Sequence, residues 1–132
     1  MVWPIKRQLE MSGIDLIVDT NLLINLAEGK PGADHYLYEN KLFVSVITEI
    51  ELLGWYKITN GQKQFFSDLL NDCKIVELMP DIKKISIELK QKQKIKLPDA
   101  VIAATAIYLD IPLLTYGSGF EKIKSLNLLL LN

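Results

Sequence analysis

The chain has 132 residues, a length typical of one folded domain, and 49% of them are hydrophobic, which excludes a disordered protein. The formal net charge of −1 excludes a strongly basic overall field of the kind that attracts nucleic acid, although a local basic patch stays possible. No apolar run reaches the roughly 18 residues that span a bilayer, so we expect no membrane association.

Two further features favour a cytoplasmic protein of one domain. The start, MVWPIKRQLE, lacks the apolar stretch of a secretion signal, and Met11 offers an alternative start. We therefore expect residues 1–10 to be an N-terminal extension and residues 11–132 to form a single domain. The single Cys73 excludes an internal disulfide, fits a reducing compartment, and is expected to be a core residue rather than a nucleophile.

Apolar runs and turn residues divide the chain into alternating strands and helices. The short apolar segments predict strands at residues 14–20, 41–47, 74–78, 111–116 and 126–131. The longer segments predict helices at residues 20–29, 33–40, 48–58 (with Gly54 inside), 60–73, 80–93 and 97–110, followed by a loop and turn at 117–123. Strands that alternate with helices predict an α/β fold with a short parallel sheet covered by helices on both faces.

Acidic residues lie where strands end and helices begin. Asp19 interrupts the apolar stretch LIVDTNLL at the end of the first strand. Glu49 and Glu51 follow the second strand, in the expected first turn of the next helix, and Asp99 opens the helix that begins LPDA. Because ligands of open α/β sheets bind beyond the carboxyl ends of the strands, these carboxylates are expected to face one cleft. Close anions repel each other, and oxygen ligands of this kind suit Mg²⁺ or Mn²⁺.

Each of these acids also has a structural interpretation. Asp19 is a good cap for a helix that starts at Thr20. The segment Thr48 to Glu51 matches a capping box, in which Glu51 would reach back to the amide of Thr48. Asp99 is favoured by the helix dipole in a first turn behind Pro98. The residues alone leave both interpretations open.

Other candidate residues give weaker signals. His35 is the single histidine and is expected at the surface, so a zinc site of the histidine and cysteine type is not expected. The lysine-rich segment 83–96 is expected to be a solvated helix face, or else a track for a phosphate backbone beside Asp99. Four aromatic residues are expected in the core or an interface rather than as base-stacking platforms: Trp55, Tyr56, Phe65 and Phe66.

From about Ile14 onward, four segments in order resemble the PIN-domain family, close to the VapC-type toxins. These segments are IVDTNLLINL, SVITEIELLG, LPDAVIAATAI and LLTYGSGFEKI. The resemblance implies a PIN-like three-layer fold with four or five strands. It also implies a metal-dependent endoribonuclease that acts on RNA such as tRNA, is inhibited by a cognate antitoxin protein, and forms a homodimer.

By position, the resemblance implies that Asp19, Glu51 and Asp99 are the catalytic and metal-binding acids of a Mg²⁺ or Mn²⁺ site. Supporting roles would fall to Thr20, Asn21, Glu49 and Ser118. One departure concerns the segment after the LLT strand, where relatives usually carry an acid or amide and then often an Asp. This chain reads Tyr116, Gly117, Ser118 and Gly119 there.

The expected function is therefore RNA hydrolysis at an acidic metal site, with two alternatives. The glycines in place of the fourth acid favour a catalytically weakened or inactive PIN-like module that binds RNA or protein. An unrelated α/β phosphatase with an Asp nucleophile after the first strand usually needs a second Asp two residues later. That position is Asn21 here, so the phosphatase ranks below the others.

Overall fold

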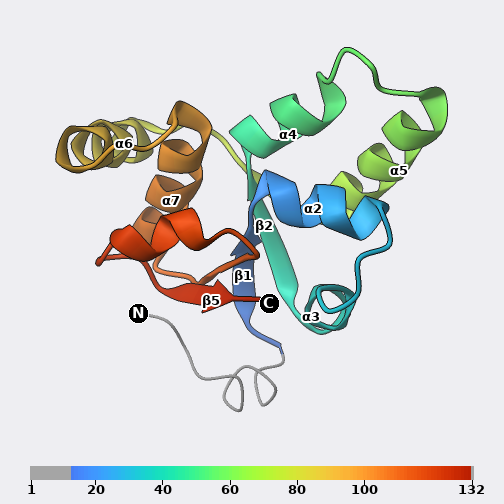
Figure 1. Cartoon of the computed structure of the whole chain (residues 1–132), viewed down its shortest axis with the longest axis horizontal. Coiled ribbons are helices and arrows are strands. Elements are labelled where there is room, and N and C mark those ends of the chain that lie inside the picture. Colours follow the sequence, from blue (N-terminus) through green and yellow to red (C-terminus); the bar gives the residue numbers. More distant parts are fainter. Residues whose placement is uncertain (1–12, 132) are drawn as a thin grey trace.

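The computed structural model describes residues 13–131, so the expected extension at 1–10 and the alternative start Met11 lie outside the described part. The strands are β1 (Asp15–Val18), β2 (Lys41–Ser45), β3 (Lys74–Val76), β4 (Leu113–Thr115) and β5 (Leu128–Leu130). The helices are α2 (Thr20–Ala27), α3 (Asp34–Glu39), α4 (Val46–Leu53), α5 (Asn60–Asn71), α6 (Pro80–Lys92), α7 (Leu97–Leu109) and the 3₁₀ helix η1 (Ser118–Lys122), shown in Figure 1.

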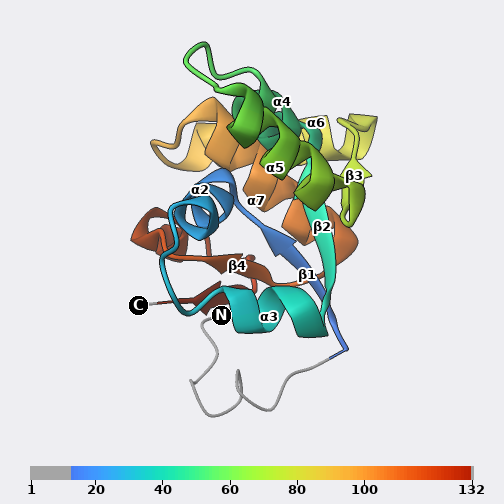
Figure 2. The ribbon, with the colours of Figure 1, turned by 90° about the vertical axis from the view of Figure 1, so that its right-hand side faces the viewer.

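The five strands form one parallel sheet in the order β3-β2-β1-β4-β5, which confirms the predicted α/β fold class. β1 is the central strand, and its Ile17 pairs with Phe43 of β2 and with Leu113 of β4. Helices cover both faces of the sheet, as the two views in Figures 1 and 2 show. The carboxyl ends of β1, β2 and β4 therefore meet at one edge, just before α2, α4 and η1.

Alternating side chains of the strands fill two separate hydrophobic cores, because successive residues of a strand point to opposite faces. Leu16 and Val18 of β1 pack in the core below α2, α3 and α5. Ile17 packs in the opposite core with α6 and α7. α7 is buried from Ala100 to Ala106, which fixes the helix whose first turn carries Asp99. None of the helices in residues 13–131 is both long and apolar enough to cross a membrane.

The prediction for the helix at 48–58 is wrong at both ends. α4 begins two residues earlier, at Val46, because the Ser45 hydroxyl caps it by accepting a hydrogen bond from the Ile47 amide at 3.1 Å. It ends at Leu53, so Gly54 is the C-cap rather than an interior residue. A Cβ atom at Gly54 would lie 2.5 Å from the carbonyl oxygen of Ile50, so only glycine fits this turn without movement of the backbone.

The predicted capping box of Thr48 and Glu51 is also wrong, since Thr48 is the third residue of α4. A capping box forms instead at the start of α5, between Thr59 and Gln62. There the backbone N–H of Gln62 donates a hydrogen bond to the Thr59 hydroxyl at 3.1 Å. The backbone N–H of Thr59 donates in return to the side-chain Oε1 of Gln62 at 3.0 Å. The segment predicted as a loop after β4 contains η1.

Candidate active site

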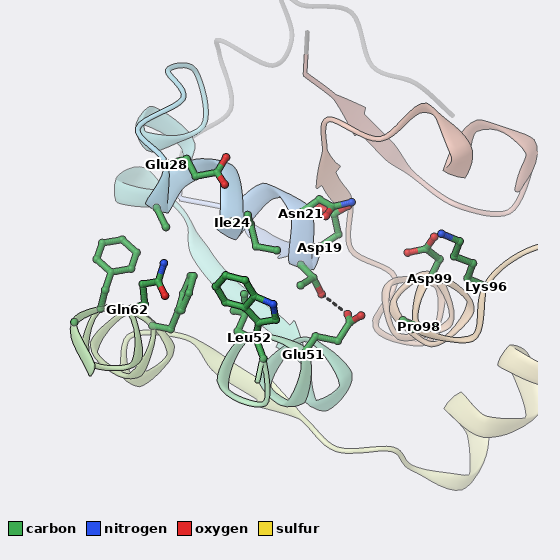
Figure 3. Close-up of a pocket in the computed structure, with 16 residues that line it drawn as sticks. Asp19, Asn21, Ile24, Glu28, Glu51, Leu52, Gln62, Lys96, Pro98 and Asp99 are labelled. Atoms are coloured by element: carbon green, nitrogen blue, oxygen red, sulfur yellow. Dashed lines mark hydrogen bonds between the residues drawn. The ribbon is translucent and has the colours of Figure 1, made fainter. Parts of the chain in front are cut away.

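A cleft of about 670 Å³ opens beyond the carboxyl end of β1 and lies between α2, α4, α5 and the start of α7 (Figure 3). One end, here called the acidic end, is lined by Asp19, Thr20, Asn21, Glu51, Lys96 and Asp99. The other, here called the aromatic end, is lined by Ile24, Leu52, Trp55, Gln62, Phe65 and Phe66. The three acids predicted from the sequence thus line one cleft, although 80 residues separate the first from the last.

Asp19 is the most buried acid of the acidic end, with only 3% of its surface exposed. Its Oδ1 accepts a hydrogen bond from the Leu22 amide at 3.0 Å, so it does cap α2 as the structural interpretation proposed. Its Oδ2 accepts a hydrogen bond from the Thr115 hydroxyl at 2.8 Å. The Thr115 hydroxyl in turn accepts a hydrogen bond from the Gly117 amide at 2.8 Å. Capping and cleft lining are therefore two roles of the same carboxylate.

Burial raises the pKa of Asp19 above its usual value of 3.8, because the anion loses hydration. The hydrogen bonds from Thr115 and Leu22 oppose this shift, and the nearby negative charge of Asp99 adds to it. The ionised carboxylate is therefore incompletely compensated by the protein itself. A cation placed between Asp19 and Asp99 would lower the pKa of Asp19 and relieve the repulsion.

Asp99 lies in the first turn of α7, where Lys96 occupies the N-cap and Pro98 the first turn. Burial raises the pKa of Asp99, and the positive charges of Lys96 and Lys122 oppose that shift. These two lysines come from different elements, the start of α7 and η1. Positive charge thus lies beside the acidic end even though the whole chain is nearly neutral.

Glu51 is an exposed residue of α4 that lies beyond the first turn, which corrects its predicted place. It accepts a hydrogen bond from the Thr20 hydroxyl at 2.7 Å, drawn as the dashed line in Figure 3. The Thr20 hydroxyl also lies 3.1 Å from that of Thr48, which is fully buried. The side chain of Glu51 is therefore directed toward α2 and the cleft by Thr20.

The remaining predicted residues divide into two groups. Thr20 and Asn21 line the acidic end. Glu49, although only two residues from Glu51, does not line the cleft, because residues two apart do not share a helix face. Ser118 is exposed at the start of η1 and does not line the cleft either.

Sequence reasoning missed two polar residues of this site. Glu28, at the C-cap of α2, lines the cleft, and Thr115 holds Asp19 from β4. Lys96, the last lysine of the lysine-rich segment 83–96, lines the cleft as well. Thr115 carries the one signal that was available, since it is a hydroxyl at the carboxyl end of a strand. Nothing in the sequence pairs it with an acid 96 residues earlier.

At the positions where an acid was expected from the resemblance, the chain makes local contacts instead. The Tyr116 hydroxyl donates to the Pro31 carbonyl at 2.9 Å, and the Lys30 ammonium lies 3.9 Å from the centre of the Tyr116 ring. The Gly117 amide donates a hydrogen bond to the Thr115 hydroxyl, and a Cβ atom at Gly117 would lie 3.3 Å from that hydroxyl. Tyr116 and Gly117 thus support the neighbouring loop and Thr115.

The donor set of the acidic end suits a hard divalent cation, because Asp19, Glu51 and Asp99 offer only oxygen ligands. Across residues 13–131, no three acidic, histidine or cysteine side chains are close enough together to hold a metal ion as a group. Mg²⁺ in proteins commonly takes only one or two carboxylates and keeps several waters. Asp19 and Asp99 line the same cleft and together supply the two carboxylates that such a cation takes.

Comparison with protein families matches residues 16–126 to the family described as PIN domain. Among solved structures, a chain of a toxin–antitoxin complex from Klebsiella pneumoniae is 33% identical, with a TM-score of 0.73 over 84% of this chain and 94% of that one. VapBC-1 from nontypeable Haemophilus influenzae is 22% identical, with a TM-score of 0.76 over 88% and 97% of the two chains.

A chain of VapBC2 from Rickettsia felis, a structure solved with a DNA fragment from the VapBC2 promoter, is 20% identical, with a TM-score of 0.75 over 89% and 99% of the two chains. The last two similarities concern the fold alone. The comparison with curated proteins finds no match. Since the family match spans residues 16–126, which is most of the chain, the chain belongs to the PIN-domain family.

Proposed function

We propose that this PIN domain is a metal-dependent endoribonuclease of the VapC-like toxin type, which hydrolyses RNA phosphodiesters at the acidic end of the cleft. The observation that carries the proposal is the convergence of Asp19, Glu51 and Asp99 on one cleft from three separate elements. The raised pKa values of Asp19 and Asp99 support it, because buried acids that are poorly compensated are typical of functional sites.

Asp19 and Asp99 are the proposed direct ligands of Mg²⁺ or Mn²⁺. Glu51, which forms no group of three with them in residues 13–131, is the proposed group that orients a water. A divalent cation held there supplies charge neutralisation at the phosphate and lowers the pKa of a bound water. Thr115 fixes the orientation of Asp19, and Thr20 fixes that of Glu51, so both acids are positioned before substrate binds.

The surroundings of the acids suit a polyanionic substrate. Lys96 lines the cleft, and Lys122 acts electrostatically on Asp99 from η1. These charges would attract the RNA backbone next to the scissile phosphate. Asn21, which is exposed in the first turn of α2, is the proposed hydrogen-bond donor to that phosphate.

The proposed partners are a structured RNA such as tRNA, a cognate antitoxin and a second copy of the chain, in the cytoplasm. The proposal of an antitoxin partner rests on the 33% identical chain from Klebsiella pneumoniae, which was solved in a toxin–antitoxin complex.

The test is cleavage of a total tRNA pool by the purified full chain, in EDTA, Mg²⁺ or Mn²⁺. Asp99→Asn is compared with Asp110→Asn, which changes an exposed acid at the other end of α7. Asp110 has a left-handed backbone conformation (φ 54°) that asparagine tolerates, so its variant should fold normally. We expect metal-dependent cutting that Asp99→Asn lowers about 100- to 1,000-fold and Asp110→Asn leaves unchanged, since a metal ligand contributes several kcal/mol.

A second candidate function is a binding module that does not cut. It is favoured by Gly117 and Gly119, which stand where the resemblance calls for acidic residues. Absence of cutting in all metals, together with absence of Mn²⁺ binding by folded protein, would favour this alternative over the nuclease. Equal activity of Asp99→Asn and the wild type would overturn the nuclease proposal.

A further inference from the structure

The aromatic end of the cleft exposes large apolar side chains next to a charged site. Trp55 is 46% exposed and Phe65 is 43% exposed, and both line the cleft. Neighbouring aromatic Phe66 is buried, at 5% exposure, in the core with Leu52 and Leu22. Two aromatic residues are thus left partly in water beside a core in which the third, Phe66, is buried.

The Phe65 ring and the backbone of Trp55 are each held by local contacts. Phe66 packs edge-on against Phe65, with 5.6 Å between ring centres and an interplanar angle of 78°. Trp55 directly follows the Gly54 cap of α4, and its carbonyl accepts a hydrogen bond from the Ile58 amide at 3.0 Å. A ring that is already positioned loses little entropy when a flat ligand stacks on it.

A polar group with spare hydrogen-bonding capacity lies beside the rings. Gln62 and Phe65 are three residues apart on α5, so they share one face of the helix, and both line the cleft. Gln62 Oε1 is used by the Thr59 amide in the capping box. Its Nε2 group donates no hydrogen bond within the part of the chain that the structure describes. The aromatic end therefore combines flat apolar faces with an available amide donor.

We propose that the aromatic end binds an unpaired base of the RNA whose phosphodiester lies at the acidic end. Trp55 and Phe65 would contact the faces of the base, and Gln62 would donate to a carbonyl on its edge. This inference rests on the proposed function, because it places one strand of RNA across both ends of the cleft. Stacking on aromatic rings is available to every base, and it requires a base whose face is not covered by a helix neighbour.

Two observations favour a nucleotide over an apolar protein segment as the occupant. The aromatic and acidic ends belong to one continuous cavity, whose volume of about 670 Å³ lies in the range of pockets for small ligands. The cavity is also amphipathic, since Gln62 lies among the apolar residues and Asn21 and Lys96 lie among the acids. A nucleotide, with a flat apolar base and a charged phosphate, matches that division.

Tryptophan fluorescence offers a direct test, because the chain has only two tryptophans, Trp3 and Trp55. A full-length Trp3→Phe, Asp99→Asn protein leaves Trp55 as the sole tryptophan and blocks cutting. The probe is a short single-stranded oligoribonucleotide in Mg²⁺, compared with the same sequence in a duplex. We expect saturable quenching of Trp55 by the single strand and little quenching by the duplex.

The matched control is Tyr56, which is 85% exposed, adjacent to Trp55, and not part of the cleft. In the Asp99→Asn background, anisotropy of the fluorescently labelled single strand should show about 10- to 100-fold weaker binding by Trp55→Ala, because a base loses its stacking partner. Tyr56→Ala should bind as tightly as its parent, and Trp55→Phe should restore most of the affinity. Circular dichroism confirms that each variant is folded.

The outcomes separate this inference from the proposed function. Cutting by the wild type with unchanged affinity of Trp55→Ala would overturn the base subsite and leave the nuclease, with the aromatic end then open to a protein segment. Quenching of Trp55 without any cutting by the wild type would leave the subsite and overturn the nuclease. Equal losses in Trp55→Ala and Tyr56→Ala, or no binding of RNA, would overturn the subsite.

Discussion

The two ends of the cleft are built on different principles. At the acidic end, Asp19 is almost fully buried and receives hydrogen bonds from α2 and from β4. At the aromatic end, Trp55 and Phe65 are nearly half exposed and are oriented by packing and by a turn. The difference indicates that charges are placed by directed hydrogen bonds from rigid strand ends, whereas apolar contacts need only a supported surface.

A comparison of two acids on α4 tests whether position or charge matters at the acidic end. Glu51 lines the cleft and accepts a hydrogen bond from Thr20, whereas Glu49, two residues earlier, does not line it. We expect Glu51→Gln to lower kcat/KM for RNA cleavage about 10- to 100-fold and Glu49→Gln to change it less than about twofold. Equal effects of the two substitutions would mean that α4 contributes only general negative charge.

The hydrogen bond from Thr115 to Asp19 is expected to matter both for metal binding and for the stability of the fold. Thr115→Val removes the hydroxyl and keeps the shape, so Asp19 loses a donor and the Gly117 amide loses its acceptor. We expect about 10-fold weaker Mn²⁺ binding by calorimetry and about 1–3 kcal/mol less stability in urea.

The control for Thr115 is Thr105→Val, because the buried Thr105 hydroxyl donates to the Val101 carbonyl inside α7. It should leave Mn²⁺ binding unchanged. If Thr115→Val also binds Mn²⁺ normally, the acidic end does not depend on a preset carboxylate.

At the aromatic end, the corresponding test concerns the turn that carries Trp55. Gly54→Ala would place a Cβ atom 2.5 Å from the Ile50 carbonyl, which forces the end of α4 to move. We expect a loss of about 1–3 kcal/mol in the free energy of unfolding. Gly119→Ala, where a Cβ atom would meet no atom within 4 Å, should change it by less than about 0.5 kcal/mol. A loss in Gly54→Ala as small as the one expected for Gly119→Ala would show that the close approach at Gly54 is relieved at no cost.

The smallest expected effect is on stability at the acidic end. Burial raises the pKa of Asp19 in the folded chain, so the folded chain holds this proton more tightly than the unfolded chain does. The contribution of Asp19 to the free energy of unfolding therefore falls as the pH rises from the usual pKa of 3.8 through the raised pKa of the folded chain. In EDTA, Asp19→Asn should be more stable than the wild type at pH 7, because asparagine caps a helix equally well and carries no charge.

This advantage of Asp19→Asn should shrink as the pH approaches 3.8, and added Mn²⁺ should stabilise only the wild type. Urea unfolding from pH 4 to about 7.5 measures both trends, a range chosen to cover the titration of a raised carboxyl pKa. An advantage that grows on acidification would show that Asp19 is stabilised as an anion by the protein alone.

The sequence was sufficient to predict the order of strands and helices, because that order follows from local patterns. It was also sufficient to predict that Asp19, Glu51 and Asp99 lie at one cleft, because ligands of open α/β sheets bind beyond the carboxyl ends of the strands. It was insufficient where two patterns compete. Thr48 to Glu51 and Thr59 to Gln62 both match a capping box, and only the second forms, because Ser45 already caps α4. Which candidate caps a helix depends on where the preceding strand ends.

The contacts that position the acids could not be predicted either, because they join distant parts of the chain. Thr20 reaches Glu51 across 31 residues, and Thr115 reaches Asp19 across 96. The aromatic residues were assigned to the core or an interface; Phe66 lies in the core, whereas Trp55 is half exposed. Exposure of Trp55 depends on how α4 and α5 are connected, and that is a tertiary property.

The central place of β1 in the sheet has a consequence during translation. β1 gains β2 as a neighbour early, but β4 and Thr115 are synthesised almost 100 residues later. A ribosome that stalls before Thr115 therefore carries a chain in which Asp19 has no hydroxyl to fix it and β1 has an open edge. Completion of the cleft is therefore delayed until Thr115 has been made, so a synthesis interrupted before that point yields a chain without the complete site.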